Sequence, residues 1–324
     1  MPDLEALSDL RTPWCLRVAV TLRIAEHMTA GTTATADLAQ AAGCDRVALG
    51  RVLGHLADRG VFERAVEGEF ALNDGARALL DPTLRIGLDL EGVGGRLALA
   101  WGTLPTYVRT GAPGYHELFG MGFWDDLAAN PEIGASFDAL MGPAGHGAAD
   151  PEFLVGDGWE SVRTVVDVGG GTGAMLAAIL AAHPAIRGTL VDVPDTVARS
   201  AETFAAAGVN DRVTATAQSF FEPLPAGADV YLLRKVINDW PDREAVAILR
   251  RCAEAAPAGG RVVVMGGVAP PDRLTTTLTE EAVLVGGRER TVAEFRELAR
   301  DAGLDVTAAE RAPSGAFVVE CRTK

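Results

Sequence analysis

The spacing of apolar positions in the second half of the chain alternates between strand-like and helix-like periods. Short runs rich in β-branched residues predict buried strands over residues 162–168, 188–193, 213–218, 230–236 and 261–266. Longer stretches of helix formers predict helices over residues 174–182, 196–207 and 243–256. Strands that alternate with helices in this way predict a doubly wound α/β domain built on a parallel sheet.

The pattern changes towards the C-terminal end. Thr291 and Glu294 have the spacing of a capping box, so a helix is expected from there to Gly303. Two apolar runs follow over residues 304–309 and 316–322, separated by a Pro-Ser-Gly turn. Because so short a connection joins neighbouring strands, the sheet is expected to end in an antiparallel hairpin.

The N-terminal part has a different pattern, mainly helical. Its periodicity predicts helices over residues 12–28, 35–42 and 46–59, followed by short strands over residues 61–64 and 69–72. Helix, helix and hairpin in this order are typical of a winged helix. We therefore expect a separate, mainly helical N-terminal domain over residues 1–96, used for dimer contacts.

A winged helix can also bind DNA, and the second helix of the pair carries Arg46, Arg51, His55 and Arg59. Basic residues spread around a helix are typical of a solvated face. The whole chain has 29 basic and 44 acidic residues and a formal charge of -15. Nucleic acids and anionic membranes require a positive surface, so we expect neither as a partner and favour a small-molecule ligand.

The cysteines give an indication of the cellular compartment. Cys15, Cys44, Cys252 and Cys321 are scattered, with no C-x-x-C pair and no histidine at ligand spacing, which is typical of reduced structural thiols and not of a metal site. The N-terminus lacks the basic-then-apolar order of a signal peptide, and no run approaches the roughly 18 apolar residues of a membrane span. We expect a cytoplasmic protein without a bound metal.

The segment over residues 97–160 combines helical spacing with glycine and proline breaks, and it holds many large apolar side chains. Any one of these can simply belong to a core. As a group directly ahead of the first α/β strand, they also suit an apolar pocket for a flat organic substrate. We take this segment as a helical pocket linker within a second domain over residues 97–324, with Phe123 and Trp124 as candidate pocket residues.

A glycine-rich turn separates the strand that ends at Val168 from the helix that begins at Ala174. It holds Gly169, Gly170, Gly171 and Gly173. A strand, a tight glycine turn and a helix start let a ligand approach the backbone closely and place polar atoms over free amide groups. The stretch therefore predicts a nucleotide-type cofactor.

Two kinds of cofactor are compatible with this turn. Gly169, Gly171 and Ala174 fit the dinucleotide fingerprint, and Asp192 lies at a suitable distance along the chain to bind ribose hydroxyls. Against a nicotinamide cofactor, Asp167 directly precedes the glycines, where a carboxylate could neutralise a cationic ligand. The close spacing of the glycines and the C-terminal hairpin also argue against a nicotinamide cofactor.

Five motifs resemble those of S-adenosylmethionine-dependent O-methyltransferases that act on small aromatic and polyketide natural products. This group includes plant caffeate-type enzymes and the bacterial anthracycline 4-O-methyltransferase and 10-hydroxylase. The motifs lie at residues 167–173, 192–194, 219–225, 238–240 and 286–291. The resemblance implies a Rossmann-like class I methyltransferase domain with a seven-stranded sheet, and a homodimer formed through the N-terminal domain.

The resemblance assigns a set of residues to S-adenosylmethionine: Asp167, Gly169, Gly171, Gly173, Asp192, Val193, Ser219, Phe220 and Arg234. The glycines would pass under its methionine part, Asp192 would accept from the ribose hydroxyls, and Phe220 would cover the adenine. Phe137 and Met141 would face the methyl group and the substrate.

The sequence departs from the family at the acid–base positions. Asn238 stands where typical members have the histidine that takes the phenolic proton, and asparagine has no titratable nitrogen at neutral pH. Gly266 stands where the family usually has an acid that orients this base, so that Glu289 is what is left of the group. Ser219 replaces a common aspartate, but its hydroxyl can still accept a hydrogen bond.

Three hypotheses follow from these departures: methyl transfer without the histidine, another reaction such as hydroxylation, decarboxylation or cyclisation, and an idle partner subunit. Positioning can supply roughly 7–11 kcal/mol of a barrier, against 10²–10⁴-fold from a general base, so we expect methyl transfer to persist. Asn238 would then orient the nucleophile, with Glu289 as a supporting carboxylate. His146 could replace the base, although an exposed loop histidine is the simpler interpretation.

Overall fold

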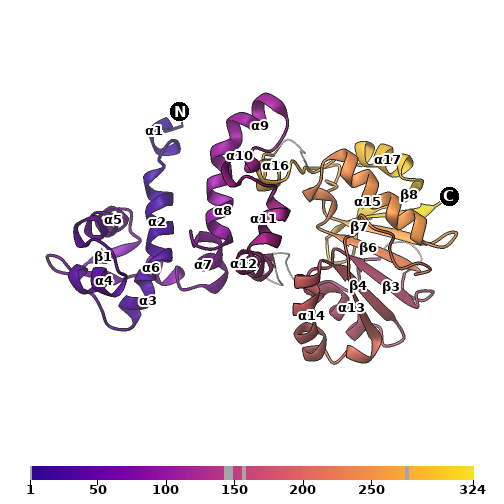
Figure 1. The fold of residues 1–324 in the computed structure, drawn as a ribbon, viewed down its shortest axis with the longest axis horizontal. Coiled ribbons are helices and arrows are strands. Elements are labelled where there is room, and N and C mark those ends of the chain that lie inside the picture. Colours follow the sequence, from indigo (N-terminus) through magenta and orange to yellow (C-terminus); the bar gives the residue numbers. More distant parts are fainter. Residues whose placement is uncertain (1, 142–148, 155–157, 274–276) are drawn as a thin grey trace. The chain divides into compact units, whose positions relative to one another are not determined.

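The computed structural model describes residues 2–141, 149–154, 158–273 and 277–324 (Figure 1). The chain divides into two compact units. The first consists of Met1–Leu99 with Glu132–Leu140, and the second of Ala100–Pro131 with Met141–Lys324.

The first unit begins with helices and a small hairpin. Its elements are α1 (Leu4–Leu7), α2 (Arg11–Thr21), α3 (Ile24–Thr29), α4 (Thr35–Ala41), α5 (Arg46–Asp58), β1 (Phe62–Arg64), β2 (Phe70–Leu72), α6 (Asp74–Ala78) and α7 (Pro82–Leu88). The two strands pair antiparallel, with Phe62 opposite Leu72. Leu38, Leu53 and Leu56 are completely buried between the helices. The predicted order of helix, helix and hairpin is confirmed.

The single helix predicted over residues 12–28 is wrong, because the chain breaks between α2 and α3. Arg23 has a φ of 52°, a left-handed conformation that an α-helix cannot include. The break redirects the chain so that α3 buries Ile24 and Met28 in the same core that α2 enters with Val20. Periodicity did not reveal the break, because the apolar spacing continues through it.

Short helices form the linker: α8 (Val93–Ala100), η1 (Trp101–Thr103), α9 (Leu104–Thr110), α10 (Tyr115–Phe119), α11 (Phe123–Ala129) and α12 (Pro131–Met141). Gly111 and Gly120 end α9 and α10 in the left-handed conformation, as glycine does at helix C-termini. The buried Tyr115 hydroxyl donates to the carboxylate of Asp126 at 2.7 Å and so ties α10 to α11.

The second unit is built on a sheet which, over the described residues, has seven strands in the order β5-β4-β3-β6-β7-β9-β8. The strands are β3 (Thr164–Val168), β4 (Arg187–Asp192), β5 (Val213–Ala217), β6 (Val230–Arg234), β7 (Arg261–Met265), β8 (Leu304–Arg311) and β9 (Phe317–Thr323). The first five run parallel, and β9 pairs antiparallel with both β7 and β8. The predicted sheet and terminal hairpin are confirmed.

The remaining elements are α13 (Ala174–Ala182), α14 (Pro194–Ala206), η2 (Asn210–Arg212), η3 (Ile237–Asp239), α15 (Asp242–Ala255), α16 (Glu280–Leu284) and α17 (Val292–Asp301). Alternate residues of β6 enter two cores: Tyr231 and Leu233 pack with α15 and α17, and Val230 and Leu232 with α13. Figure 1 shows these helices on opposite faces of the sheet. Burial of both faces explains why the central strands β3, β6 and β7 are mainly apolar. No helix within the described ranges is long and apolar enough to cross a membrane.

Candidate cofactor and substrate site

The glycine turn connects β3 to α13 at the carboxyl edge of the sheet, where ligands of doubly wound folds bind. Gly169, Gly171 and Gly173 have φ values of 68°, 60° and 82°. A Cβ atom on Gly170 would lie 2.5 Å from Asp167 Oδ2, so this position requires glycine. Around the corresponding point on Gly171, no described atom beyond its chain neighbours lies within 4 Å. The turn is therefore open to a ligand at Gly171.

Asp192, the last residue of β4, fixes the shape of this turn. Its carboxylate accepts one hydrogen bond from the Gly171 amide and one from the Val193 amide, both at 2.8 Å. Its backbone carbonyl accepts from the Gln218 amide at 2.9 Å, just beyond β5. Asp192 therefore fixes the glycine turn, at the position that the family resemblance assigns to binding of the ribose hydroxyls.

Asp167 lies against the glycine turn and is completely buried. Burial raises the pKa of its carboxyl to about 7, the positive charge of Arg234 opposes this, and the Asp192 carboxylate reinforces it. Neither carboxylate oxygen has a hydrogen-bond partner of ordinary geometry within the described part of the chain. A buried acid in this state is costly, and a cationic ligand beside it would offset the cost. The residues present therefore fit a sulfonium- and ammonium-bearing cofactor.

Ser219 and Phe220 follow β5 at the same edge. Ser219 Oγ accepts from the Phe221 amide at 3.2 Å. The Phe220 ring lies near the turn, with Cε1 3.4 Å from the point that a Cβ on Gly169 would occupy. Val193 is exposed after β4. The apolar side chains of Phe220 and Val193 are suitable for covering a flat adenine ring.

Asn238 lies in η3, a short turn after β6. Its Nδ2 donates to Asp239 Oδ1 at 2.7 Å, and its own Oδ1 is buried without a hydrogen-bond partner among the described residues. A Cβ on Gly287 would lie 2.0 Å from the Asn238 carbonyl oxygen, and one on Gly267 would lie 2.8 Å from the Asn238 amide nitrogen. The backbone of Asn238 is thus enclosed on two sides, and its amide side chain offers a free acceptor.

Arg290 stabilises this turn through hydrogen bonds to its backbone. Its guanidinium is completely buried and donates to the carbonyls of Ile237 at 2.9 Å and Trp240 at 2.7 Å, on either side of Asn238 and Asp239. It also pairs with the Asp242 carboxylate at 2.9 Å, so its charge is compensated. A planar guanidinium has five donors in fixed directions and can bind these acceptors together.

The other two acid–base positions differ from the family pattern in structure as well. Gly266 directly follows β7, and a Cβ there would lie 2.9 Å from Cδ of Lys235, whose side chain therefore passes over the position where an acid would stand. Lys235 itself has a φ of 59°. Glu289 is ion-paired with Arg273. The carboxylate of Glu289 is therefore bound by a cation and not by Asn238.

The aromatic candidates have different environments. Trp124, on α11, stacks on Trp240 with ring centroids 6.0 Å apart, next to the Asn238 turn. Trp240 in turn meets Phe220 edge to face at 5.8 Å, so these rings connect α11 with the cofactor edge. Phe123 is only 3% exposed and packs edge to face on Tyr115, which is a core environment.

Three of the predicted site residues are not placed against this edge. Phe137 belongs to the first unit, which is described separately. Met141 is the last residue of α12, before the stretch 142–148. His146 lies outside the described residues. Their roles remain predictions.

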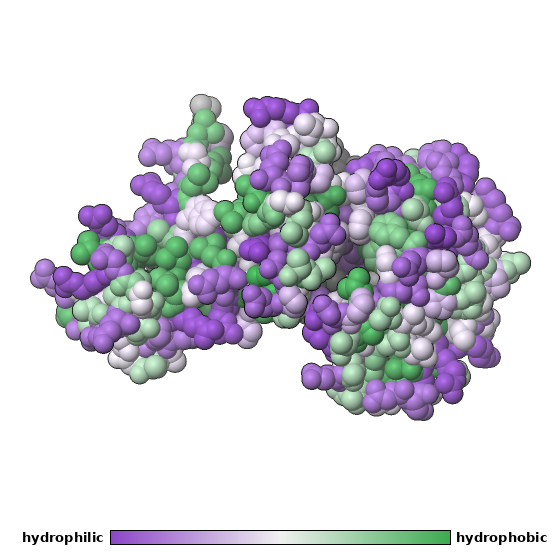
Figure 2. All heavy atoms as spheres, in the orientation of Figure 1, coloured by the Kyte–Doolittle hydropathy of each residue, from purple (hydrophilic) through white to green (hydrophobic). Residues whose placement is uncertain are grey.

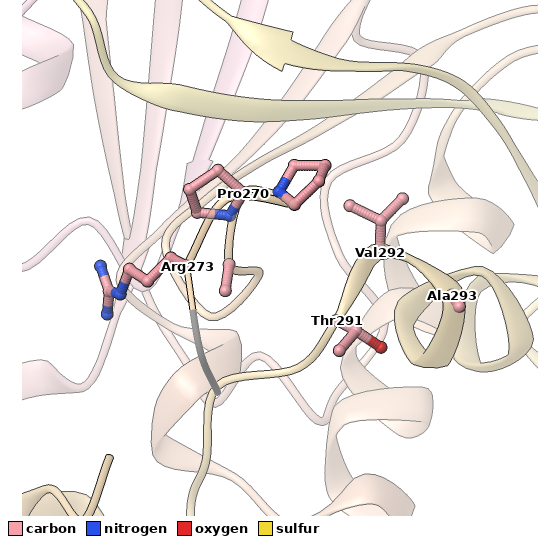
Figure 3. Close-up of a pocket in the computed structure, with 7 residues that line it drawn as sticks. Pro270, Arg273, Thr291, Val292 and Ala293 are labelled. Atoms are coloured by element: carbon pink, nitrogen blue, oxygen red, sulfur yellow. The ribbon is translucent and has the colours of Figure 1, made fainter. Parts of the chain in front are cut away.

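A cavity of about 220 Å³ lies between the segment after β7 and the start of α17, lined by Ala269, Pro270, Pro271, Arg273, Thr291, Val292 and Ala293. Figure 3 shows Pro270 and Arg273 on one side and the first residues of α17 on the other. It contains none of the predicted cofactor or substrate residues. Among the described residues, no group of three or more His, Cys, Asp or Glu side chains could hold a metal ion.

The structure adds residues that the sequence did not single out. Asp239 and Arg290 lie inside two of the motifs, which was the available signal. Glu281, on α16, acts on Asp239 electrostatically. It carried no sequence signal, because its role depends on how α16 packs beside the turn.

Comparison with known proteins identifies two domains. Residues 101–305 match the O-methyltransferase domain, and residues 4–82 match the O-methyltransferase dimerisation domain. A 2,7-dihydroxy-5-methyl-1-naphthoate 7-O-methyltransferase from Streptomyces carzinostaticus is 42% identical over 94% of this chain and 93% of its own. An aclacinomycin 10-hydroxylase from Streptomyces purpurascens is 41% identical over 93% of this chain and 83% of its own.

Solved structures agree with these sequence matches. An O-methyltransferase from neocarzinostatin biosynthesis, in complex with S-adenosyl-L-homocysteine and 1,4-dihydroxy-2-naphthoic acid, is 39% identical. Its TM-score is 0.88, and the match covers 99% of each chain. The same enzyme in complex with S-adenosylmethionine has a TM-score of 0.87. The chain therefore belongs to the S-adenosylmethionine-dependent O-methyltransferase family and carries both its catalytic and its dimerisation domain.

Proposed function

We propose that this chain transfers a methyl group from S-adenosylmethionine to an oxygen atom of a small aromatic or polyketide-type secondary metabolite, without the usual histidine base. The observation that carries the proposal is the unpaired, buried carboxyl of Asp167 beside a glycine turn that is open at Gly171 and bound by Asp192. Relatives that act on naphthoates support the substrate class.

When bound, S-adenosylmethionine supplies an electrophilic methyl group. The chain contributes position: Gly171 and Asp192 hold the cofactor side, and the free Oδ1 of Asn238 accepts a hydrogen bond from the substrate hydroxyl and orients it. Correct alignment can supply roughly 7–11 kcal/mol of the barrier, more than a general base usually contributes. Glu289, neutralised by Arg273, has at most a supporting role.

The substrate pocket is proposed from the aromatic residues. Trp124, next to the Asn238 turn through its stack on Trp240, offers a flat apolar surface for an aromatic ring. Phe137 and Met141 are proposed to complete the pocket, and Phe123 to support Trp124 from behind, at a centroid distance of 5.1 Å. His146 remains a candidate base in the linker.

The test uses a methyl donor with a deuterated methyl group and a panel of phenols and hydroxynaphthoic acids, including 1,4-dihydroxy-2-naphthoic acid. Mass spectrometry should find the label in the product. An unlabelled product with an added oxygen, formed only when the cofactor is present, would replace methyl transfer by hydroxylation. Calorimetry should show binding of S-adenosylhomocysteine, and binding of a nicotinamide nucleotide instead would contradict the cofactor site.

We also propose a homodimer formed through the N-terminal domain, in the cytoplasm, where the free cysteines stay reduced. Leu4, Leu7 and Leu10 are 73%, 74% and 72% exposed, and Trp14 on α2 continues this apolar surface. Figure 2 shows apolar residues along this N-terminal stretch. Such a surface is typical of an interaction site.

A charge at the centre of this apolar surface tests the dimer. Leu7→Asp should convert a dimer to a monomer in sedimentation velocity, because the carboxylate would have to be buried unpaired at the interface. Asp3→Asn, on the same segment, is the control and should leave the sedimentation coefficient unchanged. A monomeric wild-type protein would contradict the proposal.

A further inference from the structure

Asn238 and Asp239 form an acceptor pair on one short turn. Asn238 Nδ2 donates to Asp239 Oδ1 at 2.7 Å, which fixes the two side chains relative to each other. Among the described residues Asn238 Oδ1 has no hydrogen-bond partner, and the bond from Asn238 Nδ2 uses only one of the two oxygens of the Asp239 carboxylate. Two hydrogen-bond acceptors, one of them ionisable, are thus available where the family resemblance places its base.

The turn that carries the pair is rigid. Arg290 binds the carbonyls of Ile237 and Trp240 at its two ends, and Gly267 and Gly287 let neighbouring backbone pack directly against Asn238. A base must be held within hydrogen-bonding reach of the proton that it takes. Arg290 and the backbone at Gly267 and Gly287 hold the turn in place. The turn therefore meets this requirement although Gly266 has no acid side chain to orient a base.

The charges around Asp239 suit a proton acceptor. Burial raises the pKa of its carboxyl well above the usual range, the Glu281 carboxylate on α16 raises it further, and the Lys235 ammonium opposes both. The guanidinium of Arg290 is bound to the backbone carbonyls and to Asp242. A carboxylate whose pKa lies closer to that of a phenol is a better base than an ordinary aspartate.

We propose that Asp239 takes the proton of the substrate hydroxyl, while Asn238 orients that hydroxyl through Oδ1. The inference rests on the proposed methyl transfer. The proton passes from the substrate oxygen to the Asp239 carboxylate. The oxygen forms its bond to the methyl carbon as the bond from that carbon to sulfur breaks, and the electron pair of that bond stays on sulfur. Asp239 afterwards releases the proton to solvent.

The direct test is Asp239→Asn, which keeps the size and the hydrogen bond to Asn238 but cannot take a proton. We expect kcat to fall on the order of 10²–10⁴-fold, as for the loss of a general base. The affinity for S-adenosylhomocysteine, measured by calorimetry, should stay within about threefold, because the cofactor residues lie on other strands.

A second measurement does not depend on activity. Infrared difference spectra of the cofactor-free protein should show two carboxyl groups that titrate well above the usual aspartate range, Asp167 and Asp239. Asp239→Asn should remove one of them and Asp167→Asn the other. Glu281→Gln removes the neighbouring negative charge, so the titration of Asp239 and the rising limb of the rate–pH profile should both shift to lower pH. Glu280→Gln, on the same helix but exposed, is the matched control and should shift neither.

The possible outcomes separate the two proposals. A kcat of Asp239→Asn within threefold of an active wild type, or an Asp239 carboxyl that titrates in the usual range, would overturn the assignment of Asp239 alone. A wild-type protein that binds the cofactor but transfers no methyl group to any member of the panel would overturn the proposed function, and this inference with it.

Discussion

We propose that two halves of one sheet edge carry different parts of the chemistry. At the carboxyl ends of β3 and β4, the glycine turn and Asp192 follow the family pattern and are joined by direct hydrogen bonds. At the carboxyl ends of β6 and β7, Asn238 and Gly266 depart from the pattern, and Arg290 holds the remaining turn. Because separate strands carry the two parts, the residues for proton transfer can change while the cofactor residues are retained.

The largest effect is expected at Arg290, behind the divergent half. Arg290→Met removes one of the two cations bound to Asp242 and leaves the carbonyls of Ile237, Trp240 and Arg288 without this donor, so the free energy of unfolding should fall by about 3–5 kcal/mol in urea denaturation. Arg288→Met also removes a contact to Asp242, but a partly exposed one, and should cost less than about 1 kcal/mol. Equal losses in the two variants would contradict the role given to Arg290.

Asp167 in the cofactor half should show a stability that depends on pH. Its folded pKa of about 7 lies above the unfolded value of 3.8, so the penalty for ionising it is absent below about pH 4, grows as pH rises from there to about 7, and is complete above that. Asp167→Asn should therefore stabilise the cofactor-free protein at pH 8 by up to about 4 kcal/mol, while weakening S-adenosylhomocysteine binding.

The control for this variant is an acid at the opposite end of the same strands. Amide donors from Arg163 and Thr164 outweigh burial and hold the pKa of Asp229 below its usual value. The ionised Asp229 carboxylate stabilises the folded protein above its unfolded pKa, and this stabilisation is lost as pH falls through the folded pKa. Asp229→Asn should therefore destabilise the protein at neutral pH. If both variants stabilise the protein, or both destabilise it, the pKa values of the two carboxyls are not shifted in opposite directions.

Asp192→Ala should weaken S-adenosylhomocysteine binding by about 2–3 kcal/mol, roughly 10²-fold in Kd by calorimetry. The variant removes the acceptor for the ribose and also releases the Gly171 and Val193 amides. Asp195→Ala, exposed in the first turn of α14, should leave Kd unchanged. Unchanged binding in the Asp192 variant would mean that the cofactor binds elsewhere.

The smallest effect is expected at Asn238. Asn238→His restores the family's base but not the acid that orients it, because Gly266 has no side chain. The gain in kcat on simple phenols should therefore stay near or below about tenfold, less than the 10²–10⁴-fold of a fully oriented base. Asn238→Gln, which adds no titratable group, should give no gain. A larger gain in the histidine variant would show that orientation by an acid is dispensable here.

Local patterns made much of the fold predictable. The strand and helix alternation, the capping box at Thr291 and Glu294, and the terminal hairpin all depend on residues close together in the sequence, and each is present. The break at Arg23 was not predictable, because the apolar spacing of α2 and α3 continues across it. The structure places Phe123 in a core environment, and sequence alone could not distinguish core from pocket in that segment.

By itself, the sequence determined the family and the cofactor, and it predicted the loss of the histidine, because these depend on which residues occupy a few motifs. The tertiary structure decided how the divergent half is arranged: that Arg273 binds Glu289, that the Lys235 side chain passes over Gly266, and that a half-buried Asp239 is affected by the charge of Glu281. Charges far apart in the chain determine the proton affinity of a carboxyl only after packing brings them together and excludes water.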